Sequence, residues 1–540
     1  MIRGLMMDEP LLLGSIIEYA GRYHPETEIV ARDLAGGIVR DDYAGALDRI
    51  RRVANGLLGL GLQFSDRVAT LCWNTREHFE LFYAVPCTGG ILHTVNPRLS
   101  DAHIAYIINH GAAEILVCDA GTAEIVARLL PQLGSVRHVI HIGTPVPPAS
   151  TAPGRVDHLG YDALVADNEP LAAFPRFDEH AAAVLCYTSG TTGNPKGVLY
   201  SHRALTLIAI ASIAKDFFGG YRNGDMDVYM PIAGMFHATG WSFPYVAPIS
   251  GGKLVLPGRQ HEPEALYELL HGEKVTIAAA VPTVLLGLCD WLESRDRQLP
   301  ALRSILTSGS APSRPLIDRW EIGQGVNIVQ TWGMTEALCS SRGSLKPGLG
   351  TLPQERQLDY KQKSGRVAWG TRLRLVDEAG GELPQDGKAI GLLQARGPWI
   401  ASGYFGEDSS PLSADGWLNT GDMASIDPEG YIQIRDRAKD IIKSGGEWIS
   451  TAELEAHSLE YPGVQYAAVI GIPHPKWQER PLLIVQPRDG QDIDKAALLD
   501  FLARRVAKWW LPDNVEIVAQ MPISATGKIQ KAELRRIHAA

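Results

Sequence analysis

CYTSGTTGNPKG occupies residues 186–197; it follows an apolar strand-like run and precedes a helix that we expect to begin near Ser201. Three glycines, four hydroxyl side chains and one lysine lie within ten consecutive residues of it, 188–197. Glycines let backbone N–H groups turn toward an anion, hydroxyls add donors, and the lysine adds positive charge. The segment therefore predicts a polyphosphate loop. It is not the G-x-x-x-x-G-K-[ST] loop, because Lys196 is followed by glycine.

Short apolar runs alternate with helical stretches around this loop, from residue 40 to about 260 and again from 275 to 335. Most of them end in small or polar residues, so the alternation predicts α/β layers with parallel strands. Beyond about residue 365, short strands and tight turns predict a compact β-rich unit. The last hundred residues predict a small α+β module with an amphipathic helix over 492–510. The expected fold is thus a large, multi-subdomain α/β unit followed by a small one.

The composition of the 540 residues excludes several classes of protein. Apolar residues make up 45% and charged residues 21%, which is typical of a soluble globular protein. The net charge of −10 argues against a general nucleic-acid binder. Six scattered cysteines without zinc-type spacing favour a reduced, cytoplasmic compartment. The longest apolar stretches fall short of the roughly 20 residues that cross a bilayer, so no integral membrane segment is expected.

Seven motifs, taken in order, resemble those of the adenylate-forming (AMP-binding) superfamily, most closely its branch of medium- and long-chain acyl-CoA synthetases. After YTSGTTGNPKG they are MFHATGW at 235–241, TSGSAP at 307–312, QTWGMTE at 330–336, GWLNTGD at 416–422, RDRAKDIIKSGGEWIS at 435–450 and PISATGKIQKAELR at 522–535. The resemblance implies ATP- and Mg²⁺-dependent conversion of a small carboxylic acid to acyl-AMP, followed by transfer of the acyl group to CoA.

The resemblance also implies the roles of the catalytic residues. Glu336 matches the carboxylate that holds Mg²⁺, and Thr335 the hydroxyl at the α-phosphate. Thr188 matches a second hydroxyl near the metal and phosphates. Lys528 matches the lysine that bridges the acid and the α-phosphate during adenylation. Without the surrounding motif, Thr335 and Glu336 could equally cap a helix.

Further positions are implied to bind ATP or CoA. Asp422 matches the ribose-binding aspartate, and Trp332 matches one wall of the adenine site. The full set of cofactor-binding positions is Thr188, Ser189, Gly190, Thr191, Thr192, Gly193, Lys196, Ser308, Gly309, Ser310, Ala311, Pro312, Gln330, Thr331, Trp332, Gly333, Thr335, Asp422, Ile434, Arg437, Lys439, Lys443, Gly445, Gly446 and Trp448.

Two domains are expected, residues 1–436 binding AMP and the acyl group and residues 437–540 forming a mobile unit that carries Lys528. The resemblance implies that this unit rotates about Lys439 between the two half-reactions. Rotation would withdraw Lys528 and bring residues 443–446 to line the pantetheine tunnel. A homodimer is also expected from the resemblance alone.

The acyl pocket is expected at MFHATGW, with His237, Ala238, Gly240 and Trp241 as substrate-binding residues. His237 stands where amino-acid-activating relatives carry an aspartate, which argues against an amino-acid substrate. Three positions depart from the usual pattern, namely Gly234, Asp436 and Gln478.

Three alternatives stay open. An aryl-alkanoic or short thioether acid would be served by the same motifs. The acyl-adenylate could pass to a carrier protein or to oxygen instead of CoA. An ordinary packed helix over 235–250 would leave the pocket segment without a substrate role. A non-catalytic nucleotide-binding protein is disfavoured because Glu336 and Lys528 are both present.

Overall fold

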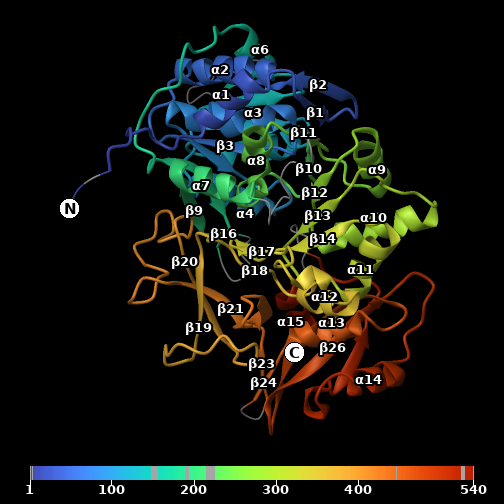
Figure 1. Ribbon diagram of the computed structural model, residues 1–540. Coiled ribbons are helices and arrows are strands. Elements are labelled where there is room, and N and C mark those ends of the chain that lie inside the picture. Colours follow the sequence, from blue (N-terminus) through green and yellow to red (C-terminus); the bar gives the residue numbers. More distant parts are fainter. Residues whose placement is uncertain are drawn as a thin grey trace.

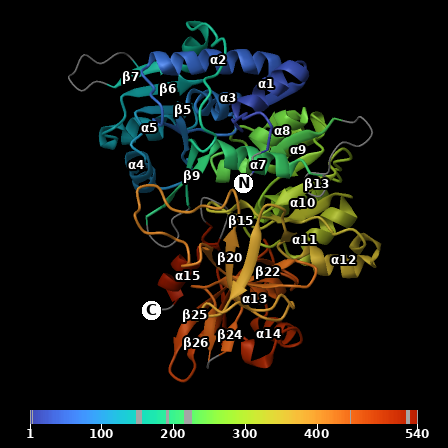
Figure 2. The ribbon, with the colours of Figure 1, turned by 60° about the vertical axis from the view of Figure 1, so that its left-hand side comes forward.

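The computed structural model describes residues 2, 4–147, 156–188, 194–214, 226–444, 447–523 and 529–538 (Figure 1). In both views the chain descends from N-terminal α/β layers through a smaller β unit to a C-terminal α+β unit at the opposite end of the molecule (Figures 1 and 2). The expected division into one large and one small α/β unit is confirmed.

The first large sheet has seven strands. In sheet order they are β7 (Asp157–Gly160), β6 (His138–Ile142), β5 (Ile115–Asp119), β3 (Arg67–Leu71), β4 (Ile91–Thr94), β8 (Ala182–Tyr187) and β9 (Gly197–Ser201). All neighbours pair in parallel except β8 and β9, which are antiparallel. The phosphate loop therefore joins two paired strands. The expected helix does begin directly after Ser201, but β9 separates it from the loop.

A second seven-stranded sheet repeats this design. Its order is β14 (Asn327–Gln330), β13 (Ser304–Thr307), β12 (Ile277–Ala279), β10 (Val228–Pro231), β11 (Lys253–Leu256), β1 (Glu28–Arg32) and β2 (Ile38–Asp42). Only the β1–β2 pair is antiparallel. The parallel strands predicted on both sides of the phosphate loop are therefore confirmed.

Helices bury both faces of each sheet, which is why the strands read as continuous apolar runs rather than alternating ones. Val68 on β3 faces the core between the two sheets, whereas its neighbour Ala69 faces the outer core of the first sheet. The helices between the sheets include α1 (Gly14–Tyr23), α2 (Tyr43–Gly59), α3 (Arg76–Ala84), α7 (His202–Ser212) and α8 (Phe243–Ser250). Outside lie α4 (Asp101–His110) and α5 (Ala123–Leu129) on the first sheet, and α9 (Pro263–Gly272), α10 (Pro282–Ser294) and α11 (Arg314–Asp318) on the second.

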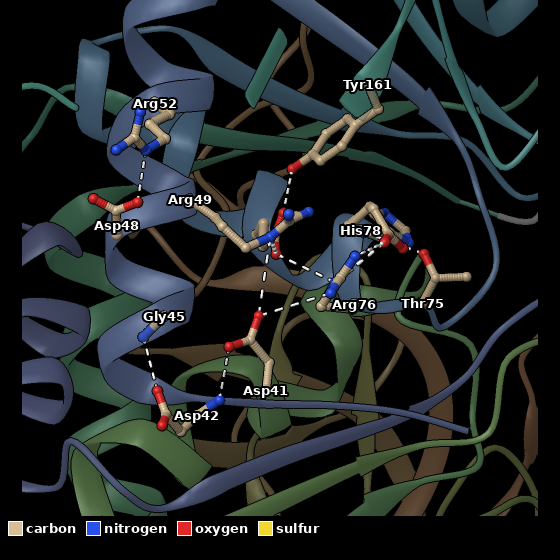
Figure 3. A network of polar contacts seen from close by, with 12 residues as sticks. Asp41, Asp42, Gly45, Asp48, Arg49, Arg52, Thr75, Arg76, His78 and Tyr161 are labelled. Atoms are coloured by element: carbon tan, nitrogen blue, oxygen red, sulfur yellow. Dashed lines mark hydrogen bonds and ion pairs between the residues drawn. The ribbon is translucent and has the colours of Figure 1, made fainter. Parts of the chain in front are cut away.

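Polar side chains connect the helices that lie between the two sheets (Figure 3). The buried carboxylate of Glu80 on α3 accepts hydrogen bonds from Arg49 Nε on α2, at 2.6 Å, and from the hydroxyl of Tyr161 on α6 (Tyr161–Ala166), at 2.7 Å. Burial raises the pKa of Glu80, against the opposing attraction of Arg49. Asp42 caps α2 by accepting from Gly45 N. This network serves the packing of helices, and it lies apart from the expected site residues.

The predicted β-rich unit is a four-stranded antiparallel sheet, confirming the expectation. Its strands are β19 (Arg372–Val376), β20 (Gly391–Arg396), β21 (Leu418–Ile426) and β22 (Ile432–Arg437). Between the second large sheet and this unit lie α12 (Gln354–Lys361) and the short strands β15 (Gly333–Met334), β16 (Leu338–Cys339), β17 (Ser341–Arg342) and β18 (Arg366–Val367).

The C-terminal unit has a five-stranded sheet of β24 (Glu447–Ile449), β23 (Ile442–Ser444), β26 (Gln478–Pro487), β25 (Val464–His474) and β27 (Asn514–Ile517), with helices α13 (Thr451–Ser458), α14 (Lys495–Ala503) and α15 (Lys531–His538). The helix expected over 492–510 is shorter, because α14 ends at Ala503. The chain then turns, and Val506 and Trp510 pack on the same core as α14.

All six cysteines are unpaired. Within the described ranges, no helix is long and apolar enough to cross a bilayer.

Candidate active site

The base of the phosphate loop is closed by two hydrogen bonds. Thr188 N donates to the carbonyl of Lys196 at 2.9 Å, and Lys196 N donates to Thr188 Oγ1 at 3.1 Å. The loop thus starts at the carboxyl end of β8, where sites of parallel sheets are usually found. Eight predicted positions lie outside the described residues, namely Ser189, Gly190, Thr191, Thr192, Gly193, Gly445, Gly446 and Lys528.

Lys196 has two neighbours that sequence reasoning missed. Its Nζ lies 3.0 Å from Glu407 Oε2 and 4.5 Å from the centre of the Tyr404 ring. Both residues belong to the segment between β20 and β21, which we call the 401–409 loop. That loop is attached to β9, because Phe405 N donates to the carbonyl of Gly197 at 2.8 Å.

Thr335 and Glu336 lie in the tight connection between β15 and β16. They do not cap a helix, so that alternative is wrong. Gly333 makes the connection possible, because a Cβ at this position would lie 2.0 Å from the carbonyl oxygen of Leu338. The close backbone packing of this hairpin therefore requires glycine at position 333, independently of any role of Gly333 in nucleotide binding.

Two tyrosines hold this pair from different elements. The hydroxyl of Tyr200, on β9, donates to the carbonyl of Thr335. The hydroxyl of Tyr404 donates to Glu336 Oε1 at 2.8 Å, and Ala401 N donates to the Glu336 carbonyl at 2.8 Å. Burial raises the pKa of Tyr404, and the neighbouring Glu336 raises it further, so the phenol stays a donor.

Glu336 fits the role of a metal-binding carboxylate. Its residue is only 7% exposed, and among the described residues it has no cationic partner. A buried carboxylate without a counter-ion is unfavourable unless a cation joins it. The described ranges hold no cluster of three or more His, Cys, Asp or Glu side chains suited to a metal. Mg²⁺ rarely needs such a cage, because one or two carboxylates and substrate phosphates usually suffice.

The predicted nucleotide-binding segments follow two neighbouring strands. Thr307 at the end of β13 pairs in register with Gln330 at the end of β14, so residues 308–312 lie beside residues 331–333. Gly309, Ser310 and Ala311 are exposed, Ser308 is half-buried, and Pro312 is buried. Gln330 and Thr331 are buried, and Thr331 N donates to the Thr307 carbonyl at 2.9 Å.

Asp422 contacts two other predicted residues, Trp332 and Arg437. Its Oδ2 accepts from the indole Nε1 of Trp332 at 2.8 Å, and its Oδ1 lies 2.9 Å from Arg437 Nε. Trp332 packs in the core of the β19–β22 sheet together with the half-buried Ile434. Gly421, with φ of +73°, makes the backbone turn that precedes Asp422. The proposed adenine and ribose positions are therefore mechanically connected.

The acyl-pocket segment has an unusual backbone. Five consecutive residues, 238–242, have positive φ angles, including Trp241 at +51°, and α8 begins only at Phe243. A helix over the whole of 235–250 is thus wrong. Left-handed conformations cost free energy for residues other than glycine and are concentrated at functional sites. Ala238 and the half-buried Trp241 pack on the core between the sheets.

Contacts of the residues just before this turn place it near the ends of β4 and β8. The carbonyl of Phe236 accepts from Thr94 Oγ1 at 3.3 Å and from Cys186 Sγ at 3.6 Å, at the ends of β4 and β8. The His237 ring lies 3.3 Å from Asn96 Nδ2. Gly234 admits the Phe236 ring, since a Cβ there would lie 2.2 Å from Phe236 Cζ.

The C-terminal residues of the prediction begin at the expected hinge, Lys439, and continue beyond it. Lys439 is exposed, and desolvation lowers its pKa. Lys443 and Trp448 face each other across β23–β24, where Lys443 Nζ also pairs with Glu378 at 3.2 Å. In both views α15, which follows Lys528 closely in the chain, faces the large domain, whereas β24 lies farther from the N-terminal layers (Figures 1 and 2). Gln478, a departure from glycine, has a φ of +70°.

Comparisons with known proteins agree with these features. The AMP-binding enzyme family matches residues 17–405, and the AMP-binding enzyme C-terminal domain matches residues 453–528. A 3-methylmercaptopropionyl-CoA ligase of Ruegeria lacuscaerulensis is 42% identical, covering 98% of each chain. A long-chain-fatty-acid–CoA ligase of Thermus thermophilus is also 42% identical, covering 98% of this chain and 96% of the relative.

Among solved structures, an anthranilate CoA ligase in complex with anthranoyl-AMP has the same fold, with a TM-score of 0.85, 24% identity and 98% of each chain covered. The motifs, the two-domain fold and the family match agree over nearly the whole chain. The chain therefore belongs to the AMP-binding enzyme family and is an AMP-forming acid–CoA ligase.

Proposed function

We propose that the preferred acid is a fatty acid of medium or long chain. Its carboxylate attacks the α-phosphorus of ATP, forming acyl-AMP and releasing pyrophosphate. The thiol of CoA then attacks the acyl carbon, so that the thioester forms and AMP leaves.

The observation that carries this proposal is the left-handed turn 238–242. It presents Ala238 and Trp241 to an apolar core and is anchored to the end of β8 from which the phosphate loop departs. An apolar tail beside this turn would place its carboxylate toward the phosphate loop and Glu336. No acidic side chain stands at position 237 to attract an ammonium group.

The roles of the polar residues follow from charge. Lys528 would bridge the acid and the α-phosphate, while Thr188, Thr335 and Lys196 would contact phosphates. Glu336, aided by Thr188, would hold Mg²⁺, which neutralises phosphate charge when bound. Asp422 and Arg437 would contact the ribose, and residues 308–312 with Trp332 would surround adenine.

We place the domain boundary between residues 436 and 437, with Lys439 as the pivot. The present arrangement, with α15 facing the large domain, suits the first half-reaction. Rotation would bring Lys443, Gly445, Gly446 and Trp448 toward the pantetheine of CoA for the second.

The test is a panel of acids with ATP and CoA, in which AMP, pyrophosphate and thioester are measured together. The panel comprises straight-chain acids from four to sixteen carbons, 3-(methylthio)propionate and 3-phenylpropionate. We expect the highest kcat/KM among the six- to sixteen-carbon acids. Trp241→Ala should alter the ranking by chain length, whereas Trp369→Ala, at an exposed surface position, should not.

A short thioether acid is the second candidate, because a relative of equal identity carries that activity in its name. Sulfur resembles a methylene in size and polarity, so 3-(methylthio)propionate is close in shape to pentanoate. If both exceed all longer acids, the medium- or long-chain proposal is wrong and the thioether acid takes its place. Pyrophosphate and acyl-AMP without thioester would instead indicate a carrier protein or another acceptor.

We expect the enzyme to work in the cytoplasm, in keeping with its six unpaired thiols. We also expect a homodimer, which analytical ultracentrifugation would detect.

A further inference from the structure

The 401–409 loop contacts two residues with different proposed roles, Glu336 as a ligand of Mg²⁺ and Lys196 as a partner of the phosphates. Tyr404 touches both of them. Its hydroxyl donates to Glu336, and its ring lies under the ammonium group of Lys196. Glu336 and Lys196 are far apart in sequence and lie on different elements, so this tyrosine is a direct physical connection between them.

The hydrogen bond from Tyr404 fixes one oxygen of the Glu336 carboxylate. Oε1 is the acceptor, whereas Oε2 has no partner among the described residues. Hydrogen bonds to a carboxylate are stronger than bonds between neutral groups, and they restrict its rotation. The free oxygen is thereby held in one direction, as a metal ligand requires.

Glu407 acts on the other group. Its carboxylate lies 3.0 Å from Lys196 Nζ, and Ser409 Oγ donates to the same Oε2 atom at 3.3 Å. The side chains of Lys196 and Glu407 are 46% and 30% exposed, so water screens their attraction. An incoming triphosphate carries several negative charges and can displace Glu407 from the lysine.

We propose that Tyr404 and Glu407 are positioning residues for the metal-bound triphosphate. Tyr404 orients the Glu336 carboxylate toward the metal, and Glu407 holds the Lys196 ammonium group until phosphate replaces it. This inference rests on the proposed roles of Glu336 and Lys196. It adds two residues that none of the seven sequence motifs contains.

The test measures ATP binding by calorimetry on the intact enzyme without acid, in the presence of EDTA and across a titration with Mg²⁺. Tyr404→Phe retains the ring beneath Lys196 and removes only the hydroxyl. We expect the Mg²⁺ concentration at half-saturation to rise about three- to tenfold, as for a lost hydrogen bond, while ATP binding in EDTA changes less than about twofold.

Glu407→Gln should have the opposite effect. It frees Lys196, so ATP binding in EDTA should tighten about two- to fivefold at low ionic strength and return to the original value at high salt. In a Lys196→Ala background the same substitution should leave ATP affinity unchanged, because the ammonium group that Glu407 contacts has been removed.

Two substitutions elsewhere serve as matched controls. Tyr360 also carries a lysine, Lys363, over its ring at 4.7 Å. Glu429 pairs with Lys346 at 2.6 Å and is similarly open to solvent. Tyr360→Phe and Glu429→Gln should leave ATP and Mg²⁺ binding unchanged.

The outcomes distinguish a failure of this inference from a failure of the proposed metal role of Glu336. If Glu336→Gln leaves the Mg²⁺ dependence unchanged, the metal role of Glu336 is wrong. If Glu336→Gln weakens Mg²⁺ binding but Tyr404→Phe does not, or if Tyr404→Phe weakens ATP binding equally in EDTA, the role of Tyr404 is overturned. Weaker ATP binding by Glu407→Gln would overturn the role of Glu407.

Discussion

The carboxylate of Asp436 binds the first turn of α13 through Thr451. Asp436 Oδ2 accepts from Thr451 N at 2.8 Å and from Thr451 Oγ1 at 2.6 Å, while its Oδ1 accepts from Arg437 N at 2.8 Å. With the proposed boundary, Asp436 belongs to the large domain and Thr451 to the small one. The proposed rotation about Lys439 would have to break this contact, so we expect it to stabilise the present arrangement of the two domains.

Asp436→Asn should therefore slow adenylation more than thioester formation. The amide accepts less strongly than the carboxylate, and in either orientation its NH₂ group faces a backbone N–H donor, that of Arg437 or that of Thr451. We expect the rate of acyl-AMP formation from acid and ATP to fall about three- to tenfold, with thioester formation from supplied acyl-AMP unchanged or faster. Thr451→Val, which keeps the N–H and removes the hydroxyl, should show a smaller shift in the same direction. A greater loss in the second half-reaction would contradict this role.

Lys528→Ala should abolish adenylation while largely sparing the transfer from supplied acyl-AMP to CoA. The lysine is proposed to neutralise charge between the carboxylate and the α-phosphate, and that charge develops only in the first half-reaction. Rapid-quench measurement of each half-reaction separates the two. Lys531→Ala is not a suitable control, because Lys531 pairs with the Glu455 carboxylate at 2.8 Å. Lys495→Ala, at a more exposed position, is suitable. Equal losses in both half-reactions would refute the assignment.

Trp332→Phe should weaken ATP binding about three- to tenfold, because Asp422 loses a donor while an aromatic ring remains. Trp399→Phe provides the control. Trp399 is also buried, but within the described part of the chain its indole nitrogen has no hydrogen-bond partner, so the change removes no such bond there. Equal ATP affinity for wild type and Trp332→Phe would show that Asp422 does not depend on the indole.

The free energy of unfolding should depend on pH through His93. Both ring nitrogens of this residue are buried and have no hydrogen-bond partner among the residues that the structure describes. Burial, with smaller effects from Arg67 and His110, lowers the pKa of His93 from 6.5 to about 3. Between these two pKa values the unfolded chain binds a proton at this histidine and the folded protein does not. The contribution of His93 to the free energy of unfolding is therefore fully present above pH 6.5 and is lost as the pH falls toward 3.

Between about pH 7 and pH 5 this single histidine should cost about 2 kcal/mol of the free energy of unfolding. His93→Gln should show a correspondingly smaller loss over the same range in urea titrations, whatever its stability at neutral pH. His180→Gln, whose side chain is 70% exposed, should follow the wild type. Parallel pH profiles for wild type and His93→Gln would contradict the prediction.

Local sequence patterns predicted much of this molecule because they need no distant partner. Apolar runs closed by small or polar residues predicted parallel strands, and β3, β5, β6, β8 and β11–β14 of the structure are such runs. Two features of the fold were not predicted by these patterns. The strand after the phosphate loop was missed because GVLYS is short. A longer α14 was expected because Leu502, Val506 and Trp510 recur every four residues, although the helix ends at Ala503.

The same division holds for the site. Sequence by itself determined the family, the two-domain chain and the candidate residues, since each motif is a contiguous stretch whose chemistry is visible in its letters. Only the tertiary structure decided which side chains meet: Tyr200 with Thr335, Tyr404 with Glu336 and Lys196, Asp436 with Thr451. The physical reason is that hydrogen bonds and ion pairs act over a few ångströms of space. The chain brings these partners together from separate strands and loops, with no spacing or periodicity along the sequence to record the contact.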